Sequence, residues 1–144
     1  MAHFAQLNEN NKIVKIVVID NDKISMGGVD DENLGVSHLQ SLYGSDSIWK
    51  QTSFNNNFRG NFAGVGYTYM PNVQTLGVGS TDIFITQKPY NSWSIGIQTA
   101  TWYSPHGPRP GITSTQVEEG KYWEWDEDAY QADNSTGWTL RTYE

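Results

Sequence analysis

Large aromatic side chains strongly outnumber leucines in this chain, and this imbalance limits how its core can be built. The 144 residues include six Trp, eight Tyr and five Phe, but only six Leu. Aromatic residues fit the pleated surface of strands, whereas Leu is among the strongest helix formers. The sequence therefore predicts a mostly β protein with one helix, in which an α+β N-terminal part precedes antiparallel, aromatic-rich β-hairpins in the C-terminal half.

The first segment has the pattern of a β-hairpin. Two apolar runs, Phe4–Leu7 and Lys12–Ile19, flank the turn sequence Asn8-Glu-Asn-Asn11. Asn tolerates the left-handed backbone region and bonds its own backbone, so it suits such turns. Because Lys12–Ile19 is apolar at nearly every position, we expect this second strand to be the core strand, covered on both faces.

A single helix is predicted after this hairpin, starting at a cap supplied by Asp30 or Asp31 and ending at Gly44. We expect it to pack on the hairpin. Its expected apolar stripe consists of Leu34, Leu39, Leu42 and Tyr43. A short strand over 48–53, anchored by Trp49, completes a predicted N-terminal part of residues 1–60.

Residues 61–144 form the predicted hairpin region, in which a weak repeat pairs aromatic segments across turns. The three expected hairpins pair 67–69 with 84, 90–93 with 102, and 122–125 with 138. A long polar loop is expected over 71–80. Between the second and third hairpins, the sequence SPHGPRPGITSTQ at 104–116 predicts an extended, Pro-rich arm.

Charge excludes broad nucleic-acid binding, because the net charge is −7 and such binding relies on Lys and Arg that meet phosphates. The acids concentrate in residues 117–144, which is compatible either with a solvated, solubilising end or with an acidic face that attracts a basic partner. Cysteine is absent, which excludes disulfides and thiolate metal sites. The longest apolar run is too short to cross a membrane, so no membrane partner is expected.

No pattern of catalytic or metal-ligating residues stands out. The three His residues lie in no metal-binding spacing, and phosphate-loop, dinucleotide and nucleophile-elbow motifs are missing. We therefore expect no catalytic residue, no cofactor, no metal and no enzymatic activity. The acidic run Asp126-Glu-Asp128 is expected to be a solvent-exposed turn, with calcium binding as a less favoured alternative for the acidic clusters.

The aromatic pairs have two interpretations, packing or binding. We expect Trp93, Trp102 and Trp138 to pack in the core. Either role fits the strand Tyr122–Trp125, whose Trp123 and Trp125 must point to one face and Tyr122 to the other. The residues that we expect at a contact surface are Tyr67, Tyr69, Pro105, Pro108, Pro110, Tyr122, Trp123 and Trp125.

Four segments together cover most of the chain in order: MAHFAQLNENNKIVKIVVIDND, SLYGSDSIWKQTSFNNNFRGNFAGVGYTYM, KPYNSWSI and YWEWDED. They resemble a group of small virion structural proteins of marine bacteriophages, cyanophages especially. The resemblance implies a capsid decoration or knob-like protein, located in the virion and assembled in the host cytoplasm. The major capsid protein or other virion proteins are the implied partners, with self-association as a further expectation.

Two alternatives remain open at the level of sequence. One is a tail- or fibre-associated structural protein. The other is a carbohydrate-binding module that uses Tyr122, Trp123 and Trp125 as stacking platforms.

Overall fold

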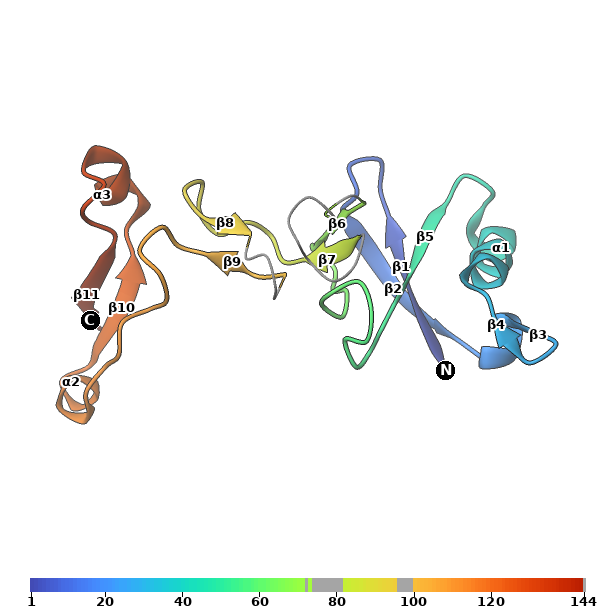
Figure 1. Cartoon of the computed structure of the whole chain (residues 1–144), viewed down its shortest axis with the longest axis horizontal. Helices are drawn as coiled ribbons and strands as arrows, with labels where there is room; N and C mark the ends of the chain where they lie inside the picture. The colour runs from blue at the N-terminus through green and yellow to red at the C-terminus, as the bar shows by residue number, and fades with distance from the viewer. Residues whose placement is uncertain (72, 74–81, 96–99, 144) are drawn as a thin grey trace. The chain divides into compact units, whose positions relative to one another are not determined.

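The computed structural model describes residues 1–71, 73, 82–95 and 100–143, which form two compact units (Figure 1). Unit 1 contains residues 1–87 and 96–101, and unit 2 contains residues 88–95 and 102–144. The boundary expected at residue 60 falls inside unit 1. Most of the polar loop expected over 71–80 lies outside the described residues.

Unit 1 is built on a three-stranded antiparallel sheet with strand order β2-β1-β5. Its strands are β1 (Ala2–Leu7), β2 (Ile13–Ile19) and β5 (Ile48–Thr52). The other elements of the unit are η1 (Asn21–Lys23), β3 (Ser25–Met26), β4 (Val29–Asp30), α1 (Glu32–Tyr43), β6 (Thr68–Met70) and β7 (Ile83–Ile85). The hairpin β6–β7 is the first of the three that the sequence predicts.

The Asn-rich turn between β1 and β2 is confirmed. The Asn8 side-chain oxygen accepts hydrogen bonds from the backbone N–H of Asn10 at 2.9 Å and of Lys12 at 3.0 Å. Asn11 takes a left-handed φ of 61°, a conformation that Asn adopts more readily than most residues. Local polar bonds therefore fix the register of the hairpin.

The central strand of the sheet is β1, so the expectation that β2 is the doubly covered core strand is wrong. Phe4 and Ala5 are fully buried, whereas Val14 and Val18 of β2 are each 47% exposed. The cause is the strand order, because β1 pairs on both sides and β2 lies at an edge.

Two hydrophobic clusters meet at β1. One joins it to the β6–β7 side and consists of Ala5, Leu7, Ile13, Ala63, Tyr69 and Phe84. The other joins it to the α1 side and consists of Ala2, Phe4, Ile24, Leu39 and Trp49. Alternate β1 residues thus enter different clusters, as the period of a strand requires.

Helix α1 begins and ends where the sequence predicts. The Asp31 carboxylate caps it by accepting from the Asn33 N–H at 2.8 Å, and Gly44 ends it with a φ of 116°. The buried face is narrower than the expected stripe, since Gly35 and Leu39 are buried but Leu42 is 64% exposed.

Unit 2 contains the second and third hairpins. The third is confirmed, whereas the first strand of the second lies at 94–95 instead of the expected 90–93, which form a turn. Strand β8 (Ser94–Ile95) pairs with β9 (Trp102–Tyr103), and β10 (Lys121–Trp125) pairs with β11 (Trp138–Thr142). Two short helices, α2 (Ser114–Glu118) and α3 (Glu127–Ala132), were not expected. The acidic run that was expected to form a turn is instead the cap and first turn of α3. The predicted fold class, mostly β with one main helix, is confirmed.

Candidate functional site

A cluster of aromatic rings forms the centre of unit 2. Trp125 is buried, with 3% exposure, and its ring centre lies 5.4 Å from those of Trp138 and Tyr130 and 5.9 Å from that of Trp93. The rings of Trp125, Trp93 and Trp138 meet edge to face, which is a favoured arrangement of aromatic pairs. Trp125 is therefore the packing centre of the unit.

The Pro-rich arm is tied to the β10–β11 hairpin by indole hydrogen bonds. Trp138 Nε1 donates to the Gly107 carbonyl at 3.2 Å, and Trp123 Nε1 donates to the Gly111 carbonyl at 3.1 Å. His106 adds a bond of 2.6 Å to the Asn134 carbonyl. The arm is irregular up to Thr113, as expected, but it belongs to unit 2 rather than linking separate parts.

Glu127 joins the third hairpin to the segment before β8. Its carboxylate accepts from Ser92 Oγ at 2.6 Å, Ser92 N at 3.1 Å, Trp125 Nε1 at 2.9 Å and Gln131 Nε2 at 2.8 Å. The Ser92 hydroxyl bond, followed by those from Trp125 and Gln131, holds the pKa of Glu127 at about 2. Sequence reasoning missed this role because the partner Ser92 lies far away in the chain.

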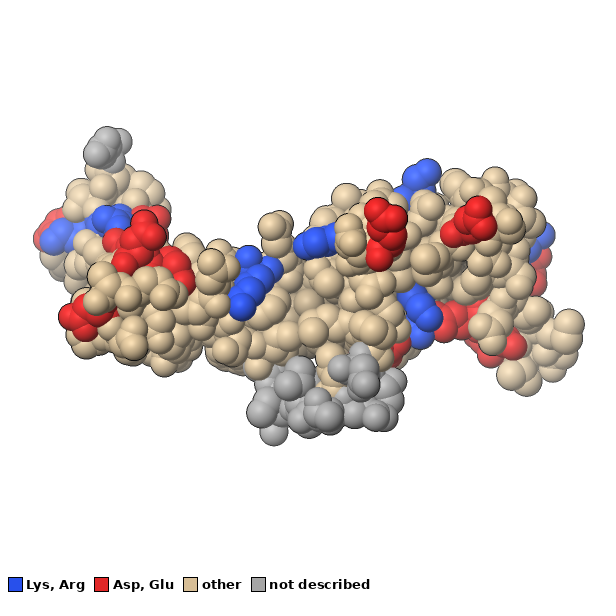
Figure 2. Space-filling model, turned by 90° about the horizontal axis from the view of Figure 1, so that it is seen from above, with Lys and Arg blue, Asp and Glu red and all other residues tan. Residues whose placement is uncertain are grey.

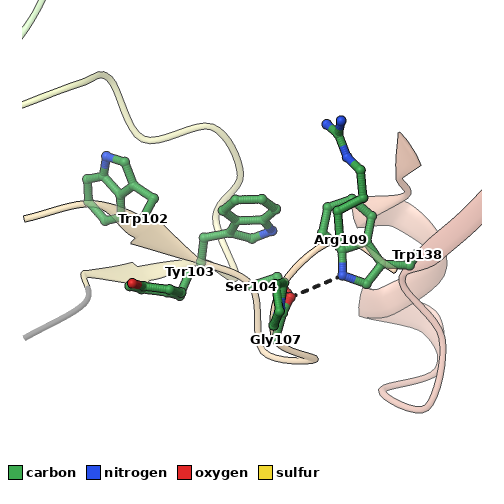
Figure 3. A pocket seen from close by; sticks show the side chains of 8 residues that line it. Trp102, Tyr103, Ser104, Gly107, Arg109 and Trp138 are labelled. Atoms are coloured by element: carbon green, nitrogen blue, oxygen red, sulfur yellow. Dashed lines mark hydrogen bonds between the residues drawn. The ribbon is translucent and has the colours of Figure 1, made fainter. Parts of the chain in front are cut away.

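An aromatic pocket of about 310 Å³ opens beside this cluster (Figure 3). Its walls include Trp93, Trp102, Tyr103 and Trp138, and the arm contributes Pro108 and Arg109. The Trp138 indole points its nitrogen to the Gly107 carbonyl, as the dashed line in Figure 3 shows. A pocket with mostly apolar walls, half of whose residues are aromatic, and few polar groups is typical of a small-molecule site.

Two cations lie over the Trp walls of the aromatic pocket. Arg109 lies 5.9 Å from the ring centre of Trp138, and Lys88 Nζ lies 5.7 Å from that of Trp102. Both distances are within the range of cation–π attraction. Within the described part of the chain, neither cation forms a salt bridge.

One polar atom of the pocket lacks a partner. Trp93 Nε1 is buried without a hydrogen bond, the single such side-chain atom among the described residues. A buried donor without an acceptor costs about 1–3 kcal/mol. The free form of unit 2 thus contains an unsatisfied group next to a cavity.

A second hollow of about 330 Å³ adjoins the same rings. Tyr122, Trp123 and Glu124 line it, together with Trp93, Arg109 and Trp138 of the aromatic pocket. Glu124 forms an ion pair with Arg141, with 2.7 Å between Oε2 and Nε. A carboxylate at its wall makes this hollow less suited to an anion than the aromatic pocket.

Three acids of the C-terminal segment form ion pairs within unit 2. Arg141 pairs with both Glu124 and Asp126, and Lys121 pairs with Glu119 at 3.0 Å. Figure 2 shows acidic and basic side chains interspersed on the visible face. With eight acids and two bases, residues 117–144 still carry a net charge of −6, so these contacts are compatible with both the solvated end and the acidic face.

Unit 1 carries a separate groove of about 380 Å³, which we call the phenylalanine groove. It is lined by Met1, His3, Phe58 and the stretch from Gln51 to Asn55, which includes Phe54. Phe54 is 65% exposed although its ring stacks on His3 at 5.6 Å and meets Phe62 edge to face at 5.3 Å. The groove was not anticipated, because single Phe residues in an Asn-rich segment give no periodic signal.

Of the residues that the sequence predicts at a contact surface, some are buried in the core and others lie at the surface. Tyr69 is buried and donates its hydroxyl to Asp82 at 2.5 Å, Tyr67 packs against the same core cluster, and Trp125 is the centre of unit 2. On the surface side, Tyr122 is half-buried and stacks on Tyr143 at 4.4 Å. The remaining members are the half-buried Trp123 and Pro110 and the exposed Pro105 and Pro108.

The described residues contain no group of three or more His, Asp or Glu arranged to hold a metal ion. No helix in the described ranges has the length and apolarity needed to cross a membrane. Comparisons with models of protein families, with curated proteins and with solved structures found no significant match. Any assignment of function therefore rests on the residues and their geometry, together with the resemblance given above.

Proposed function

We propose that the protein is a non-enzymatic virion component, a capsid decoration protein that binds the major shell through unit 1. The phage-like segments of the sequence support this proposal. The observation that carries it is the phenylalanine groove, which leaves large apolar side chains in solvent.

Leaving the Phe side chains of the groove in water is unfavourable in free energy, and a bound partner would bury them. Phe54 and Phe58 are 65% and 40% exposed, and they flank a cavity rather than standing alone on the surface. The rest of the lining is largely polar, including Gln51, Thr52, Ser53 and Asn55, so the two Phe rings are its main apolar anchors. Aromatic side chains in a partly polar surround are the residues that most often dominate the binding energy of an interface. The major capsid protein is the partner that fits the proposed location, and lasting attachment would bury more than about 1,000 Å².

The test measures how much protein stays on purified particles. We expect the wild-type chain to copurify in fixed proportion to the major capsid protein. The double variant Phe54→Ser, Phe58→Ser should occupy particles at least about tenfold less, since each lost anchor is worth about 1–2 kcal/mol. Val65→Ser is the matched control, because Val65 is 69% exposed and does not line the groove.

Two results would count against the proposal. Particles on which the chain never appears would exclude a virion component. Equal occupancy by the groove variant and the wild type would exclude the groove as the attachment surface. Dimers of the isolated protein that disappear with the groove variant would instead favour self-association through this groove.

A further inference from the structure

We propose that the aromatic pocket of unit 2 binds an anionic saccharide, a sugar unit that carries a carboxylate or a sulfate group. This site is independent of the attachment through unit 1. It also differs from the platform of Tyr122, Trp123 and Trp125, because Trp125 is buried in the packing centre.

The walls of the pocket determine the class of ligand. Trp93, Trp102 and Trp138 come from three separate strands or turns and line one cavity. Figure 3 shows Trp102 and Trp138. Flat indole faces pack against the C–H face of a pyranose ring, and they keep little conformational freedom to lose on binding. A volume of about 310 Å³ lies at the lower end of the range of small-molecule sites, so it suits one or two sugar rings.

One cation that lines the pocket, Arg109, and one beside its Trp102 wall, Lys88, determine the charge of the ligand. Arg109 and Lys88 each lie over a Trp wall, and neither is neutralised by a carboxylate of the described chain. An Arg guanidinium can donate two parallel hydrogen bonds to a carboxylate or sulfate. Because the chain as a whole has a net charge of −7, it would repel a long polyanion, which favours a short anionic unit over a nucleic acid.

Besides Arg109, the pocket has one buried side-chain donor that lacks an acceptor among the described residues. Trp138 Nε1 and Ser104 Oγ already donate to the Gly107 carbonyl, whereas Trp93 Nε1 has no acceptor. A small rotation of the Trp93 indole toward a sugar oxygen would satisfy this donor. The pocket therefore offers stacking faces, a charge and a hydrogen bond, which together distinguish an anionic sugar from a neutral apolar molecule.

The experiment titrates the full chain, followed by tryptophan fluorescence and calorimetry, with three defined oligosaccharides. They are a uronic-acid trisaccharide, a sulfated disaccharide and a neutral oligosaccharide of matched length. We expect at least one anionic sugar to bind at least about tenfold more tightly than the neutral one. Binding should weaken as ionic strength rises from about 50 to about 500 mM, because the charges are partly exposed. The preferred anion tells carboxylate recognition from sulfate recognition.

Variants assign the site. Arg109→Gln should weaken binding about tenfold and Lys88→Gln about threefold, because each removes a charge-assisted contact. Lys121→Gln is the matched control, since Lys121 pairs with Glu119 and lies outside the pocket. Trp102→Phe should weaken binding less than Trp102→Ala, because it keeps an aromatic face, and thermal unfolding should confirm that both variants fold.

Three outcomes would overturn the inference: no binding of any anionic sugar, equal binding of the neutral one, or unchanged affinity in the Arg109→Gln, Lys88→Gln double variant. None of them bears on particle attachment, which Arg109→Gln should leave intact. Conversely, Phe54→Ser, Phe58→Ser should leave sugar binding unchanged, so the two proposals can fail separately.

Discussion

At the scale of single residues, Glu127 connects parts of unit 2 that are distant in the sequence. Four hydrogen bonds reach its carboxylate, two of them from Ser92 and one from the central Trp125. A glutamine in its place would keep one carbonyl oxygen and add an N–H₂ group that faces other donors. We expect Glu127→Gln to loosen the packing of Trp93 on Trp125 and to reduce the near-ultraviolet circular dichroism of the Trp residues.

The same carboxylate makes the stability of unit 2 depend on pH. The pKa of Glu127 is held at about 2 in the folded chain, below its ordinary value of 4.5, chiefly by the Ser92 hydroxyl. A lowered pKa contributes stability above the unfolded value, and this contribution is lost as the pH falls from about 4.5 toward 2. Thermal midpoints measured between these pH values should fall in the wild type. In Glu127→Gln, the part of this fall that comes from protonating Glu127 should be missing. If the variant and the wild type lost thermal stability equally over this pH range, Glu127 would not be the group responsible.

Arg59 has the corresponding role in unit 1. Its guanidinium donates to both oxygens of Glu32, to Asp82 at 2.8 Å and to the Gln51 carbonyl at 2.9 Å. Burial opposes ionisation, but the hydrogen bonds and charge of Arg59 still lower the pKa of Glu32. For Asp82, the Tyr69 hydroxyl and Arg59 together lower the pKa against burial. The network joins α1, β5 and the segment before β7.

We expect Arg59→Met to destabilise unit 1 by about 2–3 kcal/mol, because it leaves two carboxylates together without a cation. Breaking a fully buried ion pair costs about 3–5 kcal/mol. We expect a smaller loss here because the paired side chains are 16–28% exposed to solvent. Arg141→Met is the control, and its 40% exposed side chain should be worth about 1 kcal/mol or less. Urea unfolding measures both, and equal effects would count against the network as a structural centre.

At the scale of elements, the sheet order explains which strand tolerates change. Phe4 of β1 is fully buried, whereas Val18 of the edge strand β2 is 47% exposed. Phe4→Ala should cost about 3–5 kcal/mol through the cavity that it leaves, and Val18→Thr about 0.5 kcal/mol or less. Urea unfolding measures both losses. If Phe4→Ala and Val18→Thr lowered the unfolding midpoint equally, the assignment of β1 as the central strand would be contradicted.

Helix α1 depends on a glycine at its contact with β1. A Cβ added at Gly35 would overlap the Phe4 ring and the Ile24 side chain. Although alanine is favoured over glycine in helices by about 1 kcal/mol, overpacking costs about 1–3 kcal/mol. Gly35→Ala should therefore destabilise the protein, while Ser37→Ala on the exposed face of the same helix should not. Thermal unfolding of both variants checks this difference, and a stabilised Gly35→Ala protein would contradict the close contact.

Sequence reasoning succeeded where the signal is local. Asn8 and Asn11 mark the first turn, and Asp31 and Gly44 bound α1. The spacing of aromatic residues predicts the first and third hairpins, but it places the first strand of the second hairpin at 90–93 instead of 94–95. It failed for β2 because an apolar run does not reveal which neighbour becomes the central strand. The polar residues of β1, His3 and Gln6, concealed that strand's burial.

The two unexpected helices did leave signals in the sequence. Thr113 and Gln116 form a reciprocal capping box at α2, and Asp126 caps α3 ahead of two further acids. By contrast, no local pattern could pair Ser92 with Glu127, place Lys88 over the Trp102 ring, or bring Arg109 and the Trp walls around one cavity. Those contacts depend on tertiary packing.

At the scale of the whole molecule, the two units offer different surfaces for different tasks. Unit 1 exposes the phenylalanine groove, which we assign to attachment, and unit 2 contains the aromatic pocket, which we assign to an anionic sugar. This division means that changes in one unit should leave the function of the other intact.

The most direct test of the proposed role is an electron cryomicroscopy reconstruction of an intact virion whose genome encodes this chain, searched for the density of the protein. We expect unit 1 to lie on the major shell with Phe54 and Phe58 buried in the contact. The aromatic pocket should remain open to solvent. Particles whose density accounts fully for other proteins and contains no copy of this chain would contradict the account.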